Sequence, residues 1–479
     1  KAKFQCFLND NKDKIVGKKG REPPYKKRGK FMNCDVEAET QTIVCKYGGT
    51  SMADEASVEK VARIISQESA RRYIVVSAPG KTGEYRKVTD ALIDCYHEIE
   101  QTGACSKTFP EIMRRYTLLN CEISGEEFQD VLLDVKRQME AEKNYDFCVS
   151  RGEYLSAYFF AKKIGFPFID AAELVRFKGG VFDALNTLKL CRLRLKNVQR
   201  AVIPGFYGLD ETGEIAVFSR GGSDITGSVV AQAVNASLYE NWTDVDGILS
   251  ADPHIVPQAH VIEQMTYSEL RELAYLGASV MHSDALQPLI KSRIPLQVRN
   301  TFRPESKGTL ICSCANQGGR RIVTGIAGKK DIRILFIHKI GLNAQKSVVR
   351  KVLSILEKYG VIFEHMPSSL DAVNFLIPYS SMPLKTAEKI MEEIKIEIHP
   401  DNIRMLDNFA IVSIVGKNMF QQTGVAARML GALAAEKINI RLLIQGCREI
   451  NIIAGVDENR YEDGIRALYK EFMEQSECS

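Results

Sequence analysis

The sequence lacks any long apolar run. None of its apolar stretches approaches the ~20 residues of a membrane-spanning helix, and the N-terminal residues contain no apolar core of the kind found in signal peptides. We therefore expect no membrane association and, by default, a cytoplasmic location.

Several common ligand motifs are also missing. The chain contains no G-x-x-x-x-G-K-[ST] run, which argues against a P-loop NTPase. Its 12 cysteines are scattered, and the close pair Cys312 and Cys314 does not have C-x-x-C spacing, so we expect buried free thiols. The polar loop at residues 243–253 lacks the ligand order and the terminal glutamate of an EF-hand. We predict no resident metal site.

The composition is that of a globular protein of two or three domains. The chain has 479 residues, of which 45% are hydrophobic and 26% charged. Residues 1–31 hold 11 Lys/Arg and 3 Asp/Glu, a balance of +8, so the other residues carry −4 of the net +4. A nucleic-acid-binding arm is one interpretation of this basic segment. A disordered leader, or sequence upstream of a start at Met32, is the interpretation we favour, and we expect no nucleic-acid partner.

Short apolar, β-branched runs alternate with helical patterns along the first two thirds of the chain. They occur at residues 42–46, 73–80, 166–170, 201–206 and 237–244. This order predicts an α/β domain with a mostly parallel sheet and with ligands at the carboxyl ends of its strands. Lys46, Ser77, Arg220 and Asp244 all lie at such ends, so we expect them along one rim.

The segment Val217-Phe-Ser-Arg-Gly-Gly-Ser-Asp224 predicts a strand, a glycine turn and the start of a helix. Unpaired N–H groups at a helix start bind anions. The guanidinium of Arg220 suits a carboxylate and the carboxylate of Asp224 suits an ammonium, so this turn offers both halves of a receptor for a zwitterion. The alternative is a plain turn in which Ser and Asp only cap the helix.

Two further charged residues are candidates for the same site. Lys46 ends a strand beside Gly48 and Gly49, where its ammonium can reach a phosphate; a solvated lysine is the alternative. Glu153 is expected in the first turn of a helix that begins at Tyr154. There the helix dipole would stabilise its carboxylate, or the carboxylate would hold a substrate amine.

An internal repeat follows residue 333. Residues 351–366 match residues 428–443 in apolar pattern at an offset of 77. A strand precedes each copy, and a strand and a second helix follow it, which predicts two β-α-β-β-α units of ferredoxin-like kind. Small units with open strand edges often pair, so we expect a dimeric, ligand-sensing module.

Taken together, Lys46-Tyr-Gly-Gly-Thr-Ser51, Ser219-Arg-Gly-Gly-Ser-Asp224 and Thr243-Asp-Val-Asp-Gly247 with Ala251-Asp-Pro253, ahead of two tandem repeats, resemble aspartate kinase. The resemblance covers about residues 42–475. It implies a basic leader at 1–41, a three-layer amino-acid-kinase (carbamate-kinase-like) domain at 42–325, and ferredoxin-like ACT domains at 326–408 and 409–479. It also implies transfer of the ATP γ-phosphoryl, with Mg²⁺, to the β-carboxylate of L-aspartate, the first step toward lysine, threonine and methionine.

The resemblance assigns roles to individual residues. Lys46 would neutralise the transferring phosphoryl, and the amides of Gly48–Gly49 and Gly221–Gly222 would cradle it. Arg220 would bind the aspartate α-carboxylate, and Glu153 and Asp224 would face its ammonium. The remaining residues would line the substrate pocket (Thr50, Ser51, Ser77, Thr89, Gly222 and Ser223) or the nucleotide side (Thr243, Asp244, Leu249, His254 and Ser279).

Three of these positions depart from the family pattern. Leu249 stands where many members have an aromatic residue, His254 where an arginine is usual, and Ser279 where many have a lysine. Two lost cations would weaken ATP binding, so two alternatives stay open. One is a non-catalytic amino-acid sensor on a degenerate kinase body. The other is a kinase of another small carboxylate such as acetylglutamate, although an acylated amine would not need both Glu153 and Asp224.

The repeats resemble the end-product sensors of the same family. By position, an effector site at a seam between two chains would be lined by Leu342, Ser347, Val348, Val349, Glu364, Ser368 and Ser369. We expect lysine rather than threonine as effector, because Glu364 would pair with a free amino group. A solvated Glu364 is the alternative. The resemblance implies a homodimer, or a dimer of dimers, through the ACT domains.

Overall fold

The computed structural model describes residues 41–83, 85–119, 126–277, 281, 283–313, 321–345 and 347–474. The basic leader up to residue 40 and Ser279 lie outside these ranges. Among the helices within them, none is both long enough and apolar enough to cross a membrane.

A seven-stranded sheet forms the centre of the α/β domain. Its order is β5-β2-β1-β8-β10-β11-β9, and every neighbouring pair is parallel except β10 with β11. The mostly parallel sheet predicted from the sequence is confirmed. The strands are β1 (Ile43–Tyr47), β2 (Arg71–Val76), β5 (Ala201–Pro204), β8 (Leu238–Thr243), β9 (Gln264–Thr266), β10 (Leu296–Asn300) and β11 (Thr309–Cys312).

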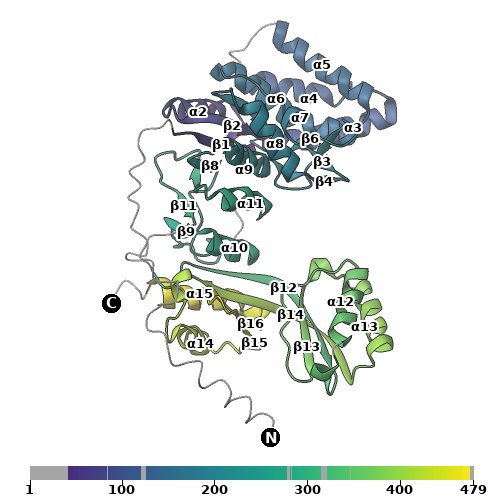
Figure 1. Ribbon diagram of the computed structural model, residues 1–479, viewed down its shortest axis with the longest axis vertical. Helices are drawn as coiled ribbons and strands as arrows, with labels where there is room; N and C mark the ends of the chain where they lie inside the picture. Colours follow the sequence, from purple (N-terminus) through teal and green to yellow (C-terminus); the bar gives the residue numbers. More distant parts are fainter. Residues whose placement is uncertain are drawn as a thin grey trace, which may run out of the picture. The chain divides into compact units, whose positions relative to one another are not determined.

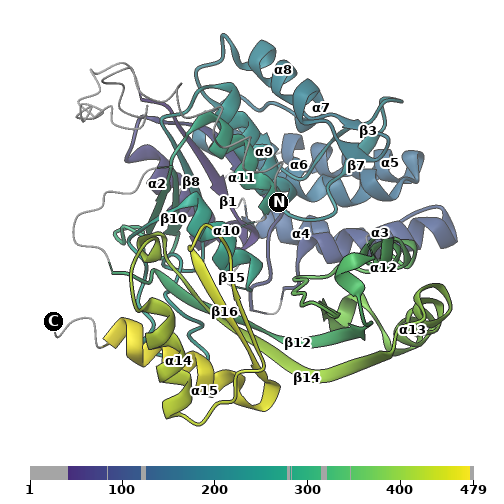
Figure 2. The same ribbon diagram turned by 60° about the horizontal axis from the view of Figure 1, so that its bottom comes forward.

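Helices cover both faces of this sheet, giving three layers (Figures 1 and 2). Side chains alternate along each strand, so Cys45 enters one core and Val44 the other. One layer holds α2 (Glu55–Ser66), α3 (Val88–Thr102), α4 (Phe109–Leu119), α5 (Glu126–Glu142) and α6 (Tyr145–Ile164). The other holds α7 (Ala171–Leu174), α8 (Ala184–Leu195), α9 (Gly222–Ala233), α10 (Tyr267–Tyr275) and α11 (Ser283–Ser292).

Two predicted strands lie outside the main sheet. The run at residues 166–170 contributes only one bridge, between Phe168 and Val202. The strand before the glycine turn, β7 (Ile215–Val217), pairs with β6 (Tyr207–Leu209) in a separate antiparallel ribbon, as β3 (Phe177–Lys178) does with β4 (Val181–Phe182). Arg220 therefore follows a hairpin and not a strand of the central sheet.

The helix that carries Glu153 starts earlier than predicted. It begins at Tyr145, capped by the Asn144 side chain, which accepts a hydrogen bond from the Phe147 N–H. Gly152 lies inside this helix, where its missing side chain makes room for the Ala78 methyl, which would lie 2.8 Å from an added Cβ. Glu153 is thus in mid-helix, and the first-turn dipole explanation was wrong.

The predicted repeat forms one five-stranded antiparallel sheet covered by four helices. The strand order is β13-β12-β14-β16-β15. Its strands are β12 (Gly325–His338), β13 (Ala372–Pro378), β14 (Asn402–Val415), β15 (Leu442–Gln445) and β16 (Asn451–Asp457). Its helices are α12 (Ser347–Lys358), α13 (Leu384–Ile398), α14 (Val425–Ala435) and α15 (Tyr461–Tyr469).

Two long strands run through both copies of the repeat (Figure 1). β12 and β14 pair from His338 with Asn402 at one end to Gly325 with Val415 at the other. We call α12, α13 and β13 with the strand halves beside them the first module, and α14, α15, β15 and β16 with the opposite halves the second module. The predicted boundary between residues 408 and 409 falls inside β14, and the domain limits stay predictions.

Candidate active site

The carboxyl end of β1 meets the start of α9. The Lys46 Nζ and the Asp224 Oδ1 lie 2.7 Å apart, with both side chains only 12% exposed. Gly221, with φ of 63°, turns the chain into α9 in a conformation that favours glycine. The structure therefore brings together one cation and one anion that the sequence placed on different elements.

The two glycines after Lys46 have different tasks. The Gly48 N–H donates to the Trp242 carbonyl at 3.2 Å, so it belongs to the sheet and is not free to cradle a phosphoryl group as expected. Gly49 packs on a second loop: the Gly80 N–H donates to its carbonyl at 2.8 Å, and an added Cβ on Gly80 would lie 2.8 Å from that carbonyl group. This backbone contact fixes the rim beside Lys46.

Arg115 of α4 ties the same two loops together, and the sequence did not reveal it. Its buried guanidinium donates to the Gly80 carbonyl at 2.9 Å and also to the Ala53 carbonyl. Burial lowers the pKa of Arg115, with Asp54 opposing that effect. An arginine in an otherwise amphipathic helix was the only available signal.

Glu153 is a buried carboxylate next to this rim. Burial raises its pKa to about 7, although a hydrogen bond from the Ala78 N–H opposes the rise. Its Oε2 has no hydrogen-bond partner among the residues that the structure describes. Such a group gains most from a ligand that donates a hydrogen bond or carries positive charge.

The other residues expected to line the substrate pocket differ in how far they are exposed to solvent. Ser77 follows β2 and Thr89 lies at the start of α3, and both are half-buried. Thr50, which follows β1, is half-buried too. Ser51 is fully buried, and its hydroxyl bonds to Thr301 Oγ1 at 2.8 Å, so it is committed to packing. Ser223 is buried in the first turn of α9 beside Gly222, where an added Cβ on Gly205 would lie 2.5 Å from its hydroxyl.

Arg220 is exposed and precedes the glycine turn of α9. Within the described parts of the chain, its side chain makes no hydrogen bond or ion pair. It is therefore available to an incoming anion, four residues before Asp224.

The expected nucleotide residues follow β8. Thr243 Oγ1 donates to Asp244 Oδ1 at 3.1 Å, and Asp244 is exposed. Asn300, which ends the neighbouring β10 and was not predicted, donates to the Asp246 carboxylate at 2.7 Å and to the Asp244 carbonyl at 3.3 Å. Asp246 also pairs with Arg303 at 2.5 Å. These contacts hold the loop after β8 in place.

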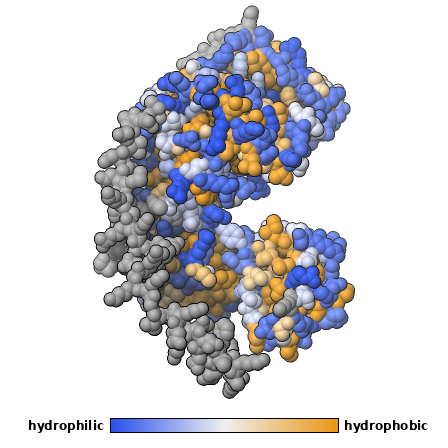
Figure 3. Space-filling model, viewed as in Figure 1, coloured by the Kyte–Doolittle hydropathy of each residue, from blue (hydrophilic) through white to orange (hydrophobic). Residues whose placement is uncertain are grey.

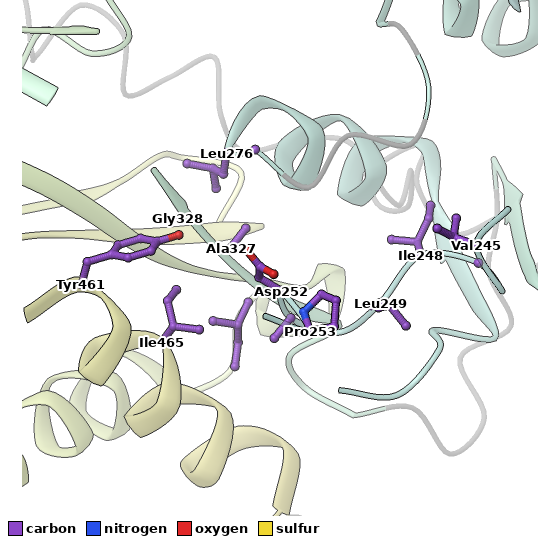
Figure 4. A pocket seen from close by; sticks show the side chains of 14 residues that line it. Val245, Ile248, Leu249, Asp252, Pro253, Leu276, Ala327, Gly328, Tyr461 and Ile465 are labelled. Atoms are coloured by element: carbon purple, nitrogen blue, oxygen red, sulfur yellow. The ribbon is translucent and has the colours of Figure 1, made fainter. Parts of the chain in front are cut away.

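Further along this loop, Leu249 bridges to Val261 and lines a cavity (Figure 4). His254 is exposed, and its backbone N–H donates to the Asp252 carboxylate at 2.9 Å. Within the described ranges, no three His, Cys, Asp or Glu side chains gather as a metal site.

The expected effector residues do not form one exposed group. Leu342 and Val348 are buried in the core of the first module, and Val349 packs against it. Ser347, Ser368 and Ser369 are exposed. The Glu364 side chain, 8% exposed, already pairs with Lys329, and its backbone carbonyl accepts from the Tyr275 hydroxyl of α10 at 2.7 Å.

Comparison with known proteins identifies the family to which this chain belongs. The sequence model of the amino acid kinase family matches residues 41–300, more than half of the chain. The chain belongs to the amino acid kinase family. The ACT domain model matches residues 412–472, within the second module. Aspartokinase 3 of Bacillus subtilis is 34% identical over 448 residues, which are 90% of this chain and 98% of that protein.

Solved structures agree with this family assignment. The aspartate kinase of Clostridium acetobutylicum is 41% identical, with a TM-score of 0.81 over 90% of this chain and 100% of that chain. Aspartokinase III of Escherichia coli in complex with aspartate and ADP shares the fold, with a TM-score of 0.71 and 23% identity over 90% and 99% of the two chains. The predicted amino-acid-kinase fold with ACT domains, and the resemblance to aspartate kinase, are confirmed.

Proposed function

We propose that this amino acid kinase is an ATP-dependent aspartate kinase that phosphorylates the β-carboxylate of L-aspartate. The observation that carries the proposal is the Lys46–Asp224 pair beside the Glu153 carboxylate, whose Oε2 has no hydrogen-bond partner among the described residues. It offers a cation for the transferring phosphoryl and anions for an ammonium within one rim of the sheet.

The chemistry needs little beyond positioning. The β-carboxylate of aspartate has a pKa near 4 and is ionised at neutral pH, so no general base has to remove a proton. Lys46 would offset charge on the phosphoryl oxygens, helped by the N–H groups that start α9. Mg²⁺ would arrive as part of the MgATP substrate, bound chiefly through phosphate oxygens and water.

Recognition of aspartate would use opposite charges at its two ends. Arg220 is free to take the α-carboxylate in a bidentate pair. Asp224 and Glu153 would share the ammonium, and the buried Glu153 Oε2 would gain its missing partner. N-acetylated substrates would give neither carboxylate a substrate ammonium, which favours a free amino acid.

An acyl-phosphate assay tests the function. The protein is incubated with MgATP and L-aspartate, and the product is trapped as hydroxamate; Lys46→Met, of similar length but uncharged, serves as control. We expect product from the wild type and a loss of about 10²–10³ in kcat in the variant. Wild-type turnover no higher than that of Lys46→Met would favour a sensor. Turnover of N-acetylglutamate but not aspartate would favour the other kinase.

Lysine is the effector that the first module suits best. Glu364 already binds the ammonium of Lys329, and its Oε2 has no hydrogen-bond partner in the described residues, so the carboxylate has capacity for a second amine. Assays with lysine, threonine and both together would identify the effector. Insensitivity to all three would remove the regulatory proposal.

A homodimer through the first module is the assembly we propose. Figure 3 shows apolar side chains gathered on one face of this module. The exposed apolar residues of the module include Ile340, Ile362 and Leu370, which are 71%, 73% and 66% exposed. Apolar surface of this extent commonly marks a protein interface. Light scattering of the wild type against Ile362→Asp would test it, with a monomeric variant as the expected result.

A further inference from the structure

The side chain of Asn241, in β8, carries a buried polar atom that the fold does not satisfy. The residue is 1% exposed, and its Oδ1 has no hydrogen-bond partner among the residues that the structure describes. An unpaired buried acceptor destabilises a fold, whereas an apolar side chain of the same shape at that position would not. A buried amide in this state therefore calls for a functional explanation.

The register of the central sheet sets Asn241 beside Lys46. β8 pairs in parallel with β1 on one side and with β10 on the other, and in this row the partners of Asn241 are Lys46 and Val298. Register partners on neighbouring strands point to the same face of a sheet, and the strands lie about 4.8 Å apart. Val298 is apolar, so Lys46 is the register partner that can donate a hydrogen bond to the Asn241 amide.

The polar side chains before and after Asn241 on the same face of β8 are already committed. The Tyr239 hydroxyl donates to the Asp224 carbonyl of α9 at 3.4 Å, and Thr243 Oγ1 donates to the carboxylate that follows it at 3.1 Å. The Lys46 ammonium has three donors, and the Asp224 carboxylate lies 2.7 Å from it. Rotation of the Lys46 side chain alone can therefore bring its ammonium to Asn241 Oδ1.

We propose that Asn241 is a positioning residue whose Oδ1 takes up the Lys46 ammonium when substrate binds. The inference rests on the proposed kinase function, in which Asp224 turns to the ammonium of aspartate and releases Lys46. A neutral amide then orients the Lys46 ammonium without cancelling its charge, so the full positive charge acts on the transferring phosphoryl group. A carboxylate in the same place would orient the ammonium equally well but offset its charge.

Asn241→Leu removes the acceptor and nearly keeps the volume. We expect kcat for acyl-phosphate formation to fall about tenfold, with KM for aspartate and KM for ATP unchanged. The unfolding temperature should not fall, because a buried unpaired acceptor is lost. A residue that only packs would give the reverse, a lower unfolding temperature with wild-type kcat. Asn186→Leu, at an exposed position of α8, is the control and should change neither quantity.

Asn241→Asp separates orientation from charge. The variant keeps the shape and an acceptor but adds a negative charge beside Lys46, so we expect kcat to fall about 100-fold, further than in Asn241→Leu. Wild-type kcat in a folded Asn241→Leu protein would overturn the proposal. An Asn241→Asp protein that is faster than Asn241→Leu would overturn the role of the neutral amide.

A crystal structure of the wild type with L-aspartate, Mg²⁺ and the non-hydrolysable ATP analogue AMP-PCP gives an answer even if the variants do not fold. We expect Lys46 Nζ within about 3.2 Å of Asn241 Oδ1. A Lys46 ammonium that contacts Asp224 and not Asn241 in this complex would overturn the proposal. A wild type that forms no acyl phosphate from aspartate refutes the kinase function instead, and a Lys46–Asn241 contact in the AMP-PCP complex would still support the positioning role.

Discussion

The two modules share a repeat but are joined to the α/β domain differently. The helix-side core of the first module is built entirely from residues 335–405. The helix-side core of the second module includes Ala251 and Val256 from the loop after β8. A self-contained core can shift as a unit, whereas a shared core transmits any shift to the loop. We infer that the first module is suited to sensing and the second to transmission.

Among the substitutions that test this difference between the modules, removal of the Glu269 side chain is expected to have the largest effect on stability. Its buried carboxylate accepts from the Lys417 N–H of the second module at 2.8 Å, from Thr324 Oγ1 at 2.6 Å and from the Thr266 N–H at 2.7 Å. Glu269→Ala leaves these donors unpaired and should cost roughly 3 kcal/mol or more of unfolding free energy in urea. Glu388→Ala, at an exposed site of α13, is the matched control and should cost almost nothing.

The same carboxylate predicts how the stability of the protein changes in acid. Burial alone would raise the pKa of Glu269, but the hydrogen bonds from Lys417, Thr324 and Thr266 outweigh it, and the pKa lies below its usual value of 4.5. Its stabilisation is therefore complete above that value and is lost as the pH falls through the lower pKa of the folded state. The stability gap between wild type and Glu269→Ala should be constant from pH 8 to pH 5 and close in stronger acid. A gap that grows in acid would contradict this assignment.

These contacts show which features of the fold and the site could be predicted from the sequence. Lys46 was predictable because the strand ends of a parallel sheet share one rim. Asp224 follows a hairpin outside that sheet, so only the resemblance to aspartate kinase assigned it to the same site. Glu269 and Lys417 are 148 residues apart, and Arg115 is 62 residues from Ala53; both side chains bind backbone groups, which carry no sequence signal.

Local ambiguity limited the rest of the prediction. The helix that carries Glu153 was predicted to begin at Tyr154 rather than at Tyr145, and the contact with Ala78 that favours Gly152 inside α6 is long-range. The repeat was found from its period, but the sharing of β12 and β14 between modules was not, since strand pairing depends on partners far along the chain. The cavity lined by Leu249, Gly328 and Ile465 combines residues of the loop after β8, β12 and α15, which no local pattern in the sequence brings together.

A substitution in the proposed aspartate site should change KM for aspartate and not KM for ATP, the reverse of what is expected for a substitution in the second module. Glu153→Gln removes one of the proposed charged partners of the ammonium, so KM for aspartate should rise about 10- to 100-fold, with KM for ATP unchanged. Because its pKa is about 7, wild-type KM for aspartate should fall as the pH rises from 6 to 8, and the variant should lose this dependence.

Stability should respond to Glu153 in the opposite sense from Glu269. A carboxyl whose pKa is raised in the folded state stabilises the fold only while protonated, so its contribution declines between pH 4.5 and about 7. Glu153→Gln should therefore unfold at a higher temperature than the wild type at pH 8. Equal unfolding temperatures at pH 8, together with a pH-independent wild-type KM, would place Glu153 outside the site.

A pair of valine truncations compares the two cores directly. Val256→Ala acts in the shared core and Val352→Ala in the self-contained one; both side chains are buried, at 1% and 0% exposure. Each should cost about 1–2 kcal/mol in unfolding free energy. Only Val256→Ala should also raise KM for ATP, by a few fold, because Val256 supports the loop that carries Leu249. An equal change of KM in both variants would refute the distinction between the modules.

The smallest effect is expected at the polar contact between α10 and the first module. Tyr275→Phe removes the hydrogen bond to the Glu364 carbonyl, worth about 0.5–1.5 kcal/mol, and should leave both Michaelis constants unchanged. If the first module is the sensor and the effector moves it away from α10, this bond would break on effector binding, so its loss should still shift the concentration of effector at half-inhibition. Tyr379→Phe is the control, since its ring lies under Arg333 at 4.0 Å and α10 is not involved. A shift of KM for ATP in Tyr275→Phe with no shift in inhibition would assign nucleotide coupling to the first module and reverse the comparison.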